Sequence, residues 1–148
     1  MIARRPVTKA VAKLLTEAVG RPCGPGVLPR TGTGPVPPPY TVLHPAGWTV
    51  QGAPMSDLSE DASAVYQVVC VAESTDQAEW LADRARAGVL ERDPSTGLWR
   101  YPLDLPAGVI CRGRSLDVDV GTDPVPGDGI VDYMIRFRFD LTTRTMQL

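Results

Sequence analysis

The stretch VDYMIRFRFDL, residues 131–141, gives the clearest indication of the fold class, because a large apolar side chain stands at every second position and the intervening positions are polar except for Met134. Its apolar members are Val131, Tyr133, Ile135, Phe137, Phe139 and Leu141. Successive side chains of a β-strand point to opposite faces of the sheet, so this alternation is typical of a strand with one buried and one solvated face. We predict a half-buried strand over residues 131–142.

Other segments read as strands of the same sheet. Residues 64–72, AVYQVVCVA, are apolar at both parities and rich in β-branched side chains, which is typical of a central strand covered on both faces. Residues 40–44, YTVLH, predict a strand that ends at Pro45. Two short strands are predicted over residues 109–112 and 116–120.

The turn sequence GTDPVPGDG, residues 121–129, predicts a loop across which the last two strands pair antiparallel. Opposite charges stabilise such a pair when they share a face of the sheet. We therefore expect acidic and basic side chains together on one face. Its expected members are Asp117, Asp119, Arg136 and Arg138.

Two amphipathic helices are predicted to cover this sheet. Over residues 7–19, VTKAVAKLLTEAV, apolar side chains recur at helical spacing, and Gly20 supplies the stop. Over residues 74–90, Ser74 and Gln77 make a capping box ahead of a narrow stripe of small apolar side chains. The helix side chains expected against the last strand are Leu14, Leu15 and Leu81.

The order of these elements is helix, strand, strand, helix, strand or strands, strand. An α+β fold accommodates it, with both helices on one face of a mainly antiparallel sheet of about four to five strands; a mixed sheet is the alternative. The chain is long enough for one domain and too short for two ordinary ones, so we expect a single domain over residues 1–148. Three segments rich in prolines, glycines or turn residues are expected to be long and irregular: residues 22–39, 46–63 and 91–108.

The first of these segments, residues 22–39, is a proline-rich arm with seven prolines and four glycines in eighteen residues. Proline fixes φ and lacks an N–H, so no helix or central strand forms at this density. The arm is either a surface that orders against a partner or a flexible surface loop.

Composition places the chain among soluble globular proteins, with 43% hydrophobic and 22% charged residues. No apolar run is long enough to cross a bilayer, and the basic residues near the N-terminus are not followed by the apolar core of a signal peptide. We expect no membrane partner, and an origin in a cytoplasm or in a particle assembled there.

Patterns for catalysis and metal binding are lacking. The three cysteines are widely spaced without a CxxC pair, and the single histidine, His44, cannot complete a zinc site with them at usual spacings. Neither a nucleophile elbow nor a G-K-[ST] phosphate loop is present. The acids of residues 117–123 lack the glycine position and closing glutamate of a calcium loop. We expect no enzymatic activity, no metal and no cofactor.

Charge is unevenly distributed, although the net charge is only −2. Residues 1–30 carry six basic side chains and one acidic one, whereas residues 31–148 carry nine basic and sixteen acidic ones. A basic end on an acidic body suits head-to-tail or layered protein contacts, and it also suits a nucleic-acid arm. The basic end lacks the interleaved aromatic side chains that stack on bases, which favours protein contacts.

Four stretches together resemble the tail terminator (tail completion) proteins of long-tailed bacteriophages, especially those of actinobacterial hosts. They are VTKAVAKLLTEAVGRP at 7–22, PPPYTVLHP at 37–45, VYQVVCVAESTDQAEWLADRAR at 65–86 and the closing alternating strand. The most specific piece is a strand of the VYQV type followed at once by a helix of the QAEWLADR type. The resemblance spans nearly the whole chain and contains no catalytic motif.

The resemblance implies a compact α/β subunit of a hexameric ring, which caps the growing tail tube, fixes its length and docks to the head-side connector. The implied partners are further copies of the chain, the tail tube protein, and a connector or stopper protein. DNA passes through the lumen without specific binding, and the implied location is the tail or neck of a virion assembled in the host cytoplasm. The proline-rich arm is longer than this family's pattern, so its role stays open.

Two other functions fit the same residues. One is another neck, head–tail joining or tail tube protein of the same particle, although a tube subunit needs more strands than this sequence predicts. The other is a small cytoplasmic ligand-binding α+β domain.

The long loops carry apolar side chains that a lone domain has little reason to expose. The expected contact residues toward neighbouring subunits or the tube are Trp48, Val50, Met55, Leu58, Trp99 and Tyr101. Arg4 and Arg5 are expected near a face of the ring, with acidic side chains toward the lumen.

Overall fold

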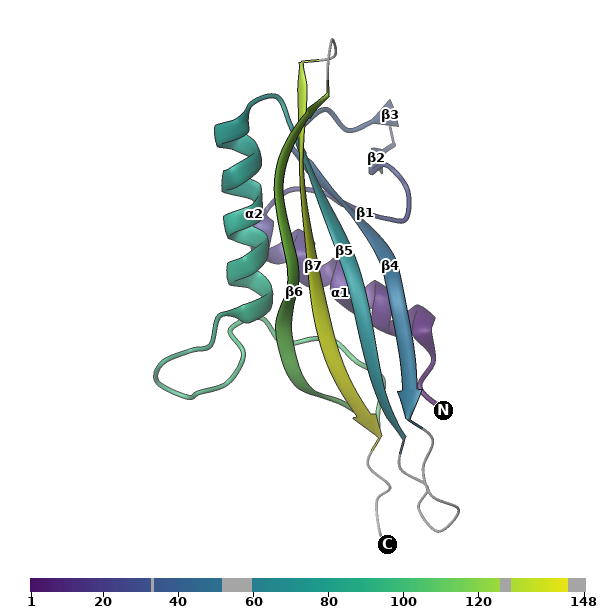
Figure 1. Ribbon diagram of the computed structural model, residues 1–148. Helices are drawn as coiled ribbons and strands as arrows, with labels where there is room; N and C mark the ends of the chain where they lie inside the picture. Colours follow the sequence, from purple (N-terminus) through teal and green to yellow (C-terminus); the bar gives the residue numbers. More distant parts are fainter. Residues whose placement is uncertain (33, 52–59, 126–128, 144–148) are drawn as a thin grey trace, which may run out of the picture.

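The protein is described by a computed structural model that covers residues 1–32, 34–51, 60–125 and 129–143. Five strands form one sheet in the order β1-β4-β5-β7-β6 (Figure 1). They are β1 (Cys23–Pro25), β4 (Tyr40–Gln51), β5 (Asp61–Ala72), β6 (Val109–Val125) and β7 (Ile130–Thr143). β1 pairs with β4 in parallel and the other neighbours pair antiparallel. The predicted α+β class is confirmed, with a mixed, mostly antiparallel sheet.

Both helices cover the same face of this sheet, α1 (Arg4–Val19) and α2 (Thr75–Leu90) (Figure 1). The alternating apolar side chains of β7 point to this helix layer, and Phe137 is fully buried there. The helix residues Leu14, Leu15 and Leu81 belong to the same core cluster, as predicted. Each large apolar side chain removed from water contributes about 1.5–3 kcal/mol, so this layer is the main source of stability.

The helix ends follow from local sequence. The Ser74 hydroxyl accepts a hydrogen bond from the Gln77 backbone N–H at 3.2 Å, and the Gln77 side chain accepts one from the Glu73 N–H at 3.0 Å. This is the predicted cap, shifted by one residue in its second bond. Gly20 ends α1 in the left-handed conformation, with φ of 76°. Neither described helix is long and apolar enough to cross a membrane.

The proline-rich arm contains short strands and is tied to the main sheet. Its second sheet consists of β2 (Arg30–Thr31) and β3 (Gly34–Pro35). The Gly26 N–H donates to the Leu43 carbonyl at 2.6 Å, and Arg21 Nε donates to the Pro39 carbonyl at 2.8 Å. β1, at the start of the arm, is an edge strand, which agrees with the exclusion of a central strand at this proline density.

β4 and β5 are longer than predicted, so the expected loop over residues 46–63 is shorter. β4 continues through Pro45 to Gln51, with a bulge next to Pro45. β1 pairs with β4 as far as Leu43, so Pro45 lies on a free edge, where its missing N–H removes no ladder bond. β5 begins at Asp61.

The prediction of two short strands followed by a loop over residues 121–129 is wrong. β6 is a single strand that runs through Val125 and pairs with β7. Its register shifts at three places, leaving Arg112, Asp117 and Val120 outside the ladder. At each bulge β6 has one residue more than the facing segment of β7, so pairing continues in a shifted register. The strand therefore extends past positions at which the sequence predicts that it ends.

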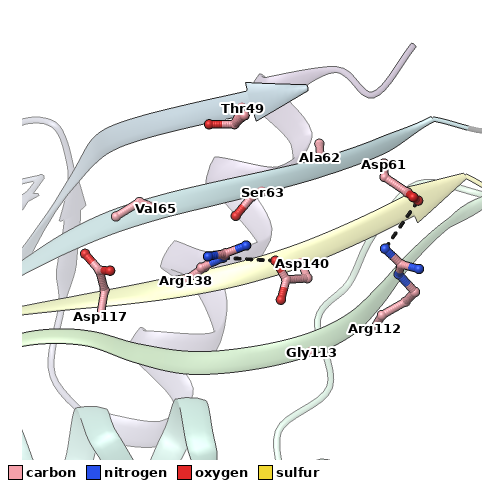
Figure 2. A pocket seen from close by; sticks show the side chains of 10 residues that line it. All are labelled: Thr49, Asp61, Ala62, Ser63, Val65, Arg112, Gly113, Asp117, Arg138 and Asp140. Carbon is pink, nitrogen blue, oxygen red and sulfur yellow. Dashed lines mark hydrogen bonds and ion pairs between the residues drawn. The ribbon is translucent and has the colours of Figure 1, made fainter. Parts of the chain in front are cut away.

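The bulges also decide which charged side chains share a face. Asp117 lies with Arg138 on the open face, which is the face opposite the helices (Figure 2). Asp119 was expected there too, but it pairs with Ile135 and points to the helix layer. There it accepts a hydrogen bond from Arg86 of α2 at 2.9 Å. The charge prediction is therefore right for Asp117 and wrong for Asp119, because a one-residue bulge reverses the alternation that follows it.

The expectation that β5 is covered on both faces is also wrong. On the helix side its residues are buried, whereas Val65, Gln67 and Val69 are half-buried on the open face. The arm contributes residues beside the end of β5 nearest Val71, and the described residues supply no second layer elsewhere. Apolar side chains at both parities indicate burial on two faces only when a second layer exists to cover them.

Candidate assembly surface

Two of the predicted contact residues lie at the outer edge of the sheet, on β4. Val50 is 47% exposed, and Trp48 is half-buried against the edge of the core. The Arg4 guanidinium lies 5.4 Å from the centre of the Trp48 ring, a distance at which a cation is attracted to an aromatic face. Arg4 and Trp48 thus form one surface feature. Met55 and Leu58 lie outside the described residues.

The other two predicted residues lie after α2. Tyr101 is half-buried and packs against the core cluster. Trp99 is half-buried between two guanidinium groups, those of Arg92 at 4.1 Å and Arg114 at 4.7 Å from the ring centre. This stack joins the irregular segment to β6, which carries Arg114.

Arg114 is a buried cation, with 8% of its surface exposed. Burial lowers the pKa of its guanidinium, and its Nε has no hydrogen-bond partner among the described residues. One terminal nitrogen donates to the Val89 carbonyl at 3.3 Å, in the last turn of α2, where the helix dipole favours positive charge. Arg114 therefore links the end of α2 to β6, and its guanidinium packs against the Trp99 ring.

Residues 91–100 form a hairpin, here called the Leu98 hairpin, which is held by its own hydrogen bonds. The Asp93 N–H donates to the Leu98 carbonyl at 2.8 Å, and the Arg100 N–H donates to the Glu91 carbonyl at 3.0 Å. The Asp93 carboxylate accepts bonds from the Ser95 side chain at 2.6 Å and backbone at 2.8 Å, which lower the pKa of Asp93. Leu98 is nevertheless 69% exposed. The hairpin therefore keeps the apolar side chain of Leu98 exposed to solvent.

A groove of about 680 Å³ lies on the open face. Figure 2 shows the side chains that line it, of which five are charged. Arg112 pairs with Asp61 at 3.4 Å, and Arg138 pairs with Asp140 at 3.1 Å. Asp117 has no ion-pair partner among the described residues. The lining of the groove thus has three carboxylates and two guanidinium groups, one acid more than its bases neutralise. It lacks the excess of basic side chains that nucleic-acid phosphates attract.

A second groove, here called the apolar groove, has a volume of about 500 Å³ and lies where the arm meets the open face. Its apolar lining comes from the arm and from three strands, and comprises Val27, Leu28, Val42, Val69, Val71 and Ile130. Val27 and Leu28 form an exposed rim, at 64% and 57% exposure. Asp132 brings one carboxylate to the lining, and its charge contributes to a raised pKa of Tyr40, behind the larger effect of burial.

The basic end of the chain lies on the exposed side of α1. Arg5 and Lys9 are exposed and have no acidic partner among the described residues, whereas Lys13 pairs with Asp104 at 3.3 Å. The uneven charge of the sequence thus becomes a basic helix surface on the side opposite the acidic groove.

The described residues offer little for chemistry. Burial raises the pKa of all three thiols, Cys23, Cys70 and Cys111, and that of Cys70 to about 12. Such thiols stay protonated near neutral pH and are poor nucleophiles. No group of three or more potential metal ligands gathers in the described ranges. The described surface presents two grooves, the exposed Leu98 side chain (the apolar knob) and charged side chains that have no ion-pair partner among the described residues. These features suit binding to another macromolecule.

Neither the exposure of Leu98 nor the apolar groove was predicted from the sequence. The turn sequence DPSTG over residues 93–97 signals a tight hairpin that presents the next residue, and this signal was available. No local signal marks the groove, because its lining combines the arm with three strands that are distant in sequence.

No protein-family model and no curated protein matches this chain. Among solved structures, a chain of the "Virion of native gene transfer agent (GTA) particle" superposes with a TM-score of 0.60. The superposition covers 92% of this chain and 94% of that chain, at 18% sequence identity. At this identity the likeness shows a common fold, which extends over nearly the full length of both chains.

Proposed function

We propose that this chain is a structural subunit of a phage-like virion and acts there as a tail terminator. In this proposal a hexameric ring caps the tail tube, ends its elongation and joins the tail to the head-side connector or stopper, while DNA passes through the lumen. The observation that carries the virion assignment is the shared fold with a virion chain over 92% of this chain. The sequence resemblance to tail terminators supports the specific role.

The surface supports an assembly role for the chain. Among the described residues, Arg5 and Lys9 on α1 and Asp117 in the groove of the open face have no ion-pair partner. A basic helix surface thus lies opposite a groove with one excess acid, as suits a contact between unlike surfaces of neighbouring copies. We keep Trp48, Val50, Trp99 and Tyr101, with Arg4 and Arg5, as the proposed contact residues. An acidic groove that faces the lumen keeps passing DNA from adhering.

The test is to interrupt the coding sequence in the genome that carries it and to image the particles by electron microscopy. We expect tails of uncontrolled length that are not joined to heads, and restoration when the wild-type chain is supplied. Normal tails joined to filled heads in the interrupted strain would contradict the proposal. Tube polymerisation that fails altogether would point to a tube subunit instead.

Complementation with two tryptophan variants tests the proposed contact. Trp48→Ala should give a folded chain that does not restore tail length, because aromatic anchors dominate the energy of interfaces. Trp80→Ala is the matched control, since Trp80 is 42% exposed on α2 and lies outside the proposed contact. Equal restoration by both variants would remove Trp48 from the interface.

A further inference from the structure

The Leu98 hairpin has the properties of a docking element. Its backbone is fixed by internal hydrogen bonds, and the stack of Arg92, Trp99 and Arg114 anchors it to the sheet. A side chain on a fixed loop loses little conformational entropy when it binds, so the affinity gained from its burial is largely retained. Leu98, more exposed than any other large apolar side chain described apart from Met1, is therefore placed to insert into an apolar site.

The apolar groove is a site of the matching kind on the same chain. It is open to solvent, its rim is formed by the exposed Val27 and Leu28, and its floor is formed by valines of β4 and β5. Its volume of about 500 Å³ admits a leucine side chain together with neighbouring atoms of a hairpin. Burial of a leucine contributes favourably in proportion to the apolar area removed from water.

The two features lie at opposite ends of one molecule, so a chain cannot fill its own groove. In Figure 1 the irregular segment that follows α2 lies beside the lower end of that helix, while β2, β3 and the arm lie at the upper end of the sheet on the other side. An apolar knob and a complementary pocket at different places on one chain produce a contact between unlike surfaces, which repeats from copy to copy.

Charge at the two surfaces is complementary. Arg92 pairs across the hairpin with Trp99, the neighbour of Leu98 in the chain, and its guanidinium stacks on the Trp99 ring. It donates to the Gly97 carbonyl at 3.1 Å and has no carboxylate partner among the described residues. The apolar groove contains the carboxylate of Asp132. A cation beside the knob and an anion in the groove favour the docked orientation over others.

We propose that the Leu98 hairpin of one copy of this chain docks in the apolar groove of the next copy, with the Leu98 side chain between the rim and the valines of the floor. The proline-rich arm then supplies one wall of a subunit interface. This deepens the proposed function and rests on it in one respect, because a ring requires a contact of this heterologous kind. Closure of the repeated contact by rotation gives a ring.

Cysteine cross-linking tests the contact directly. A chain with both Leu98→Cys and Leu28→Cys should oxidise to a ladder of covalent multimers that ends at a discrete largest species. A mixture of the two single variants should give covalent dimers of one variant with the other and no longer ladder. The wild-type chain, with its three native thiols, is the control. Absence of the ladder in a chain that still assembles would overturn the proposed contact.

A substitution pair gives an independent readout by light scattering. Leu98→Asp should raise the concentration needed for assembly at least about tenfold, whereas Val120→Asp, at a position on β6 that is 60% exposed, should leave it unchanged. Both variants should retain the circular dichroism of the wild type. Unchanged assembly of Leu98→Asp would contradict the contact while leaving the tail terminator proposal intact. If the chain forms cross-linked rings but interruption of its gene leaves the tails normal, the contact is supported and the terminator role is contradicted.

Discussion

Gly88 marks the closest approach of the two helices and offers a sharp test of how the helix layer packs. A methyl group at Gly88 would lie 2.4 Å from the Cβ of Ala18 on α1. Carbon atoms in contact are ordinarily separated by about 3.5–4.0 Å, so the Gly88→Ala side chain requires the helices to move apart by more than about 1 Å. Ala18 itself is buried, and its Cβ is fixed to the backbone, so only a shift of the helix can relieve the contact.

Two opposing effects set the magnitude. Overpacking a close contact destabilises by about 1–3 kcal/mol. Replacing glycine by alanine inside a helix stabilises by about 1 kcal/mol, because alanine restricts the unfolded chain. With so short a contact we expect the clash to prevail, and Gly88→Ala to lower the free energy of unfolding by about 1–2 kcal/mol. In an Ala18→Gly background the clash disappears, so the same substitution should raise it by about 1 kcal/mol.

The measurement is urea unfolding followed by circular dichroism for the wild type, both single variants and the double variant. It is repeated at two protein concentrations, because assembly adds a concentration-dependent contribution. The expected signature is a reversal of sign between the two backgrounds, with a coupling energy of about 2–3 kcal/mol. A stabilising Gly88→Ala in the wild-type background, or equal effects in both backgrounds, would refute the described crossing of α1 and α2.

Three further predictions concern the core and the helix cap. Phe137→Ala should lower the free energy of unfolding by about 3–5 kcal/mol in urea titrations, because the side chain is fully buried; a loss below about 1 kcal/mol would contradict this burial. Ser74→Ala should cost about 1 kcal/mol through loss of the bond to the Gln77 N–H, and Ser74→Asp should retain most of it; equal losses would argue against the cap. Burial raises the pKa of the Cys70 thiol from 9.0 to about 12. The contribution of the protonated thiol to the free energy of unfolding should therefore be fully present below about pH 9 and be lost as the pH rises toward 12. Cys70→Ala should lack this part of the alkaline loss, and an identical pH profile would contradict it.

The assembly surface could be predicted only in part from the sequence. The segment over residues 91–108 was recognised as irregular with aromatic side chains, and the structure uses Trp99 to anchor it and Leu98 as its exposed member. The pairing of Trp48 with Arg4 joins a strand to a helix that are distant in sequence. No spacing rule links such residues, because their proximity depends on how the helix layer lies on the sheet.

Local sequence is sufficient to specify the elements whose side-chain pattern repeats along the backbone. The alternation of residues 131–141 and the stripe of residues 7–19 specify a strand and a helix, because side-chain direction repeats every 2 and about 3.6 residues along the backbone. Tertiary structure decided the extent of β4 and β6, the face on which Asp119 lies, and the burial of Arg114. Strand ends and bulges depend on the hydrogen bonds that a neighbouring strand offers, and the burial of a charge depends on what packs around it. Both are long-range interactions, which no window of sequence contains.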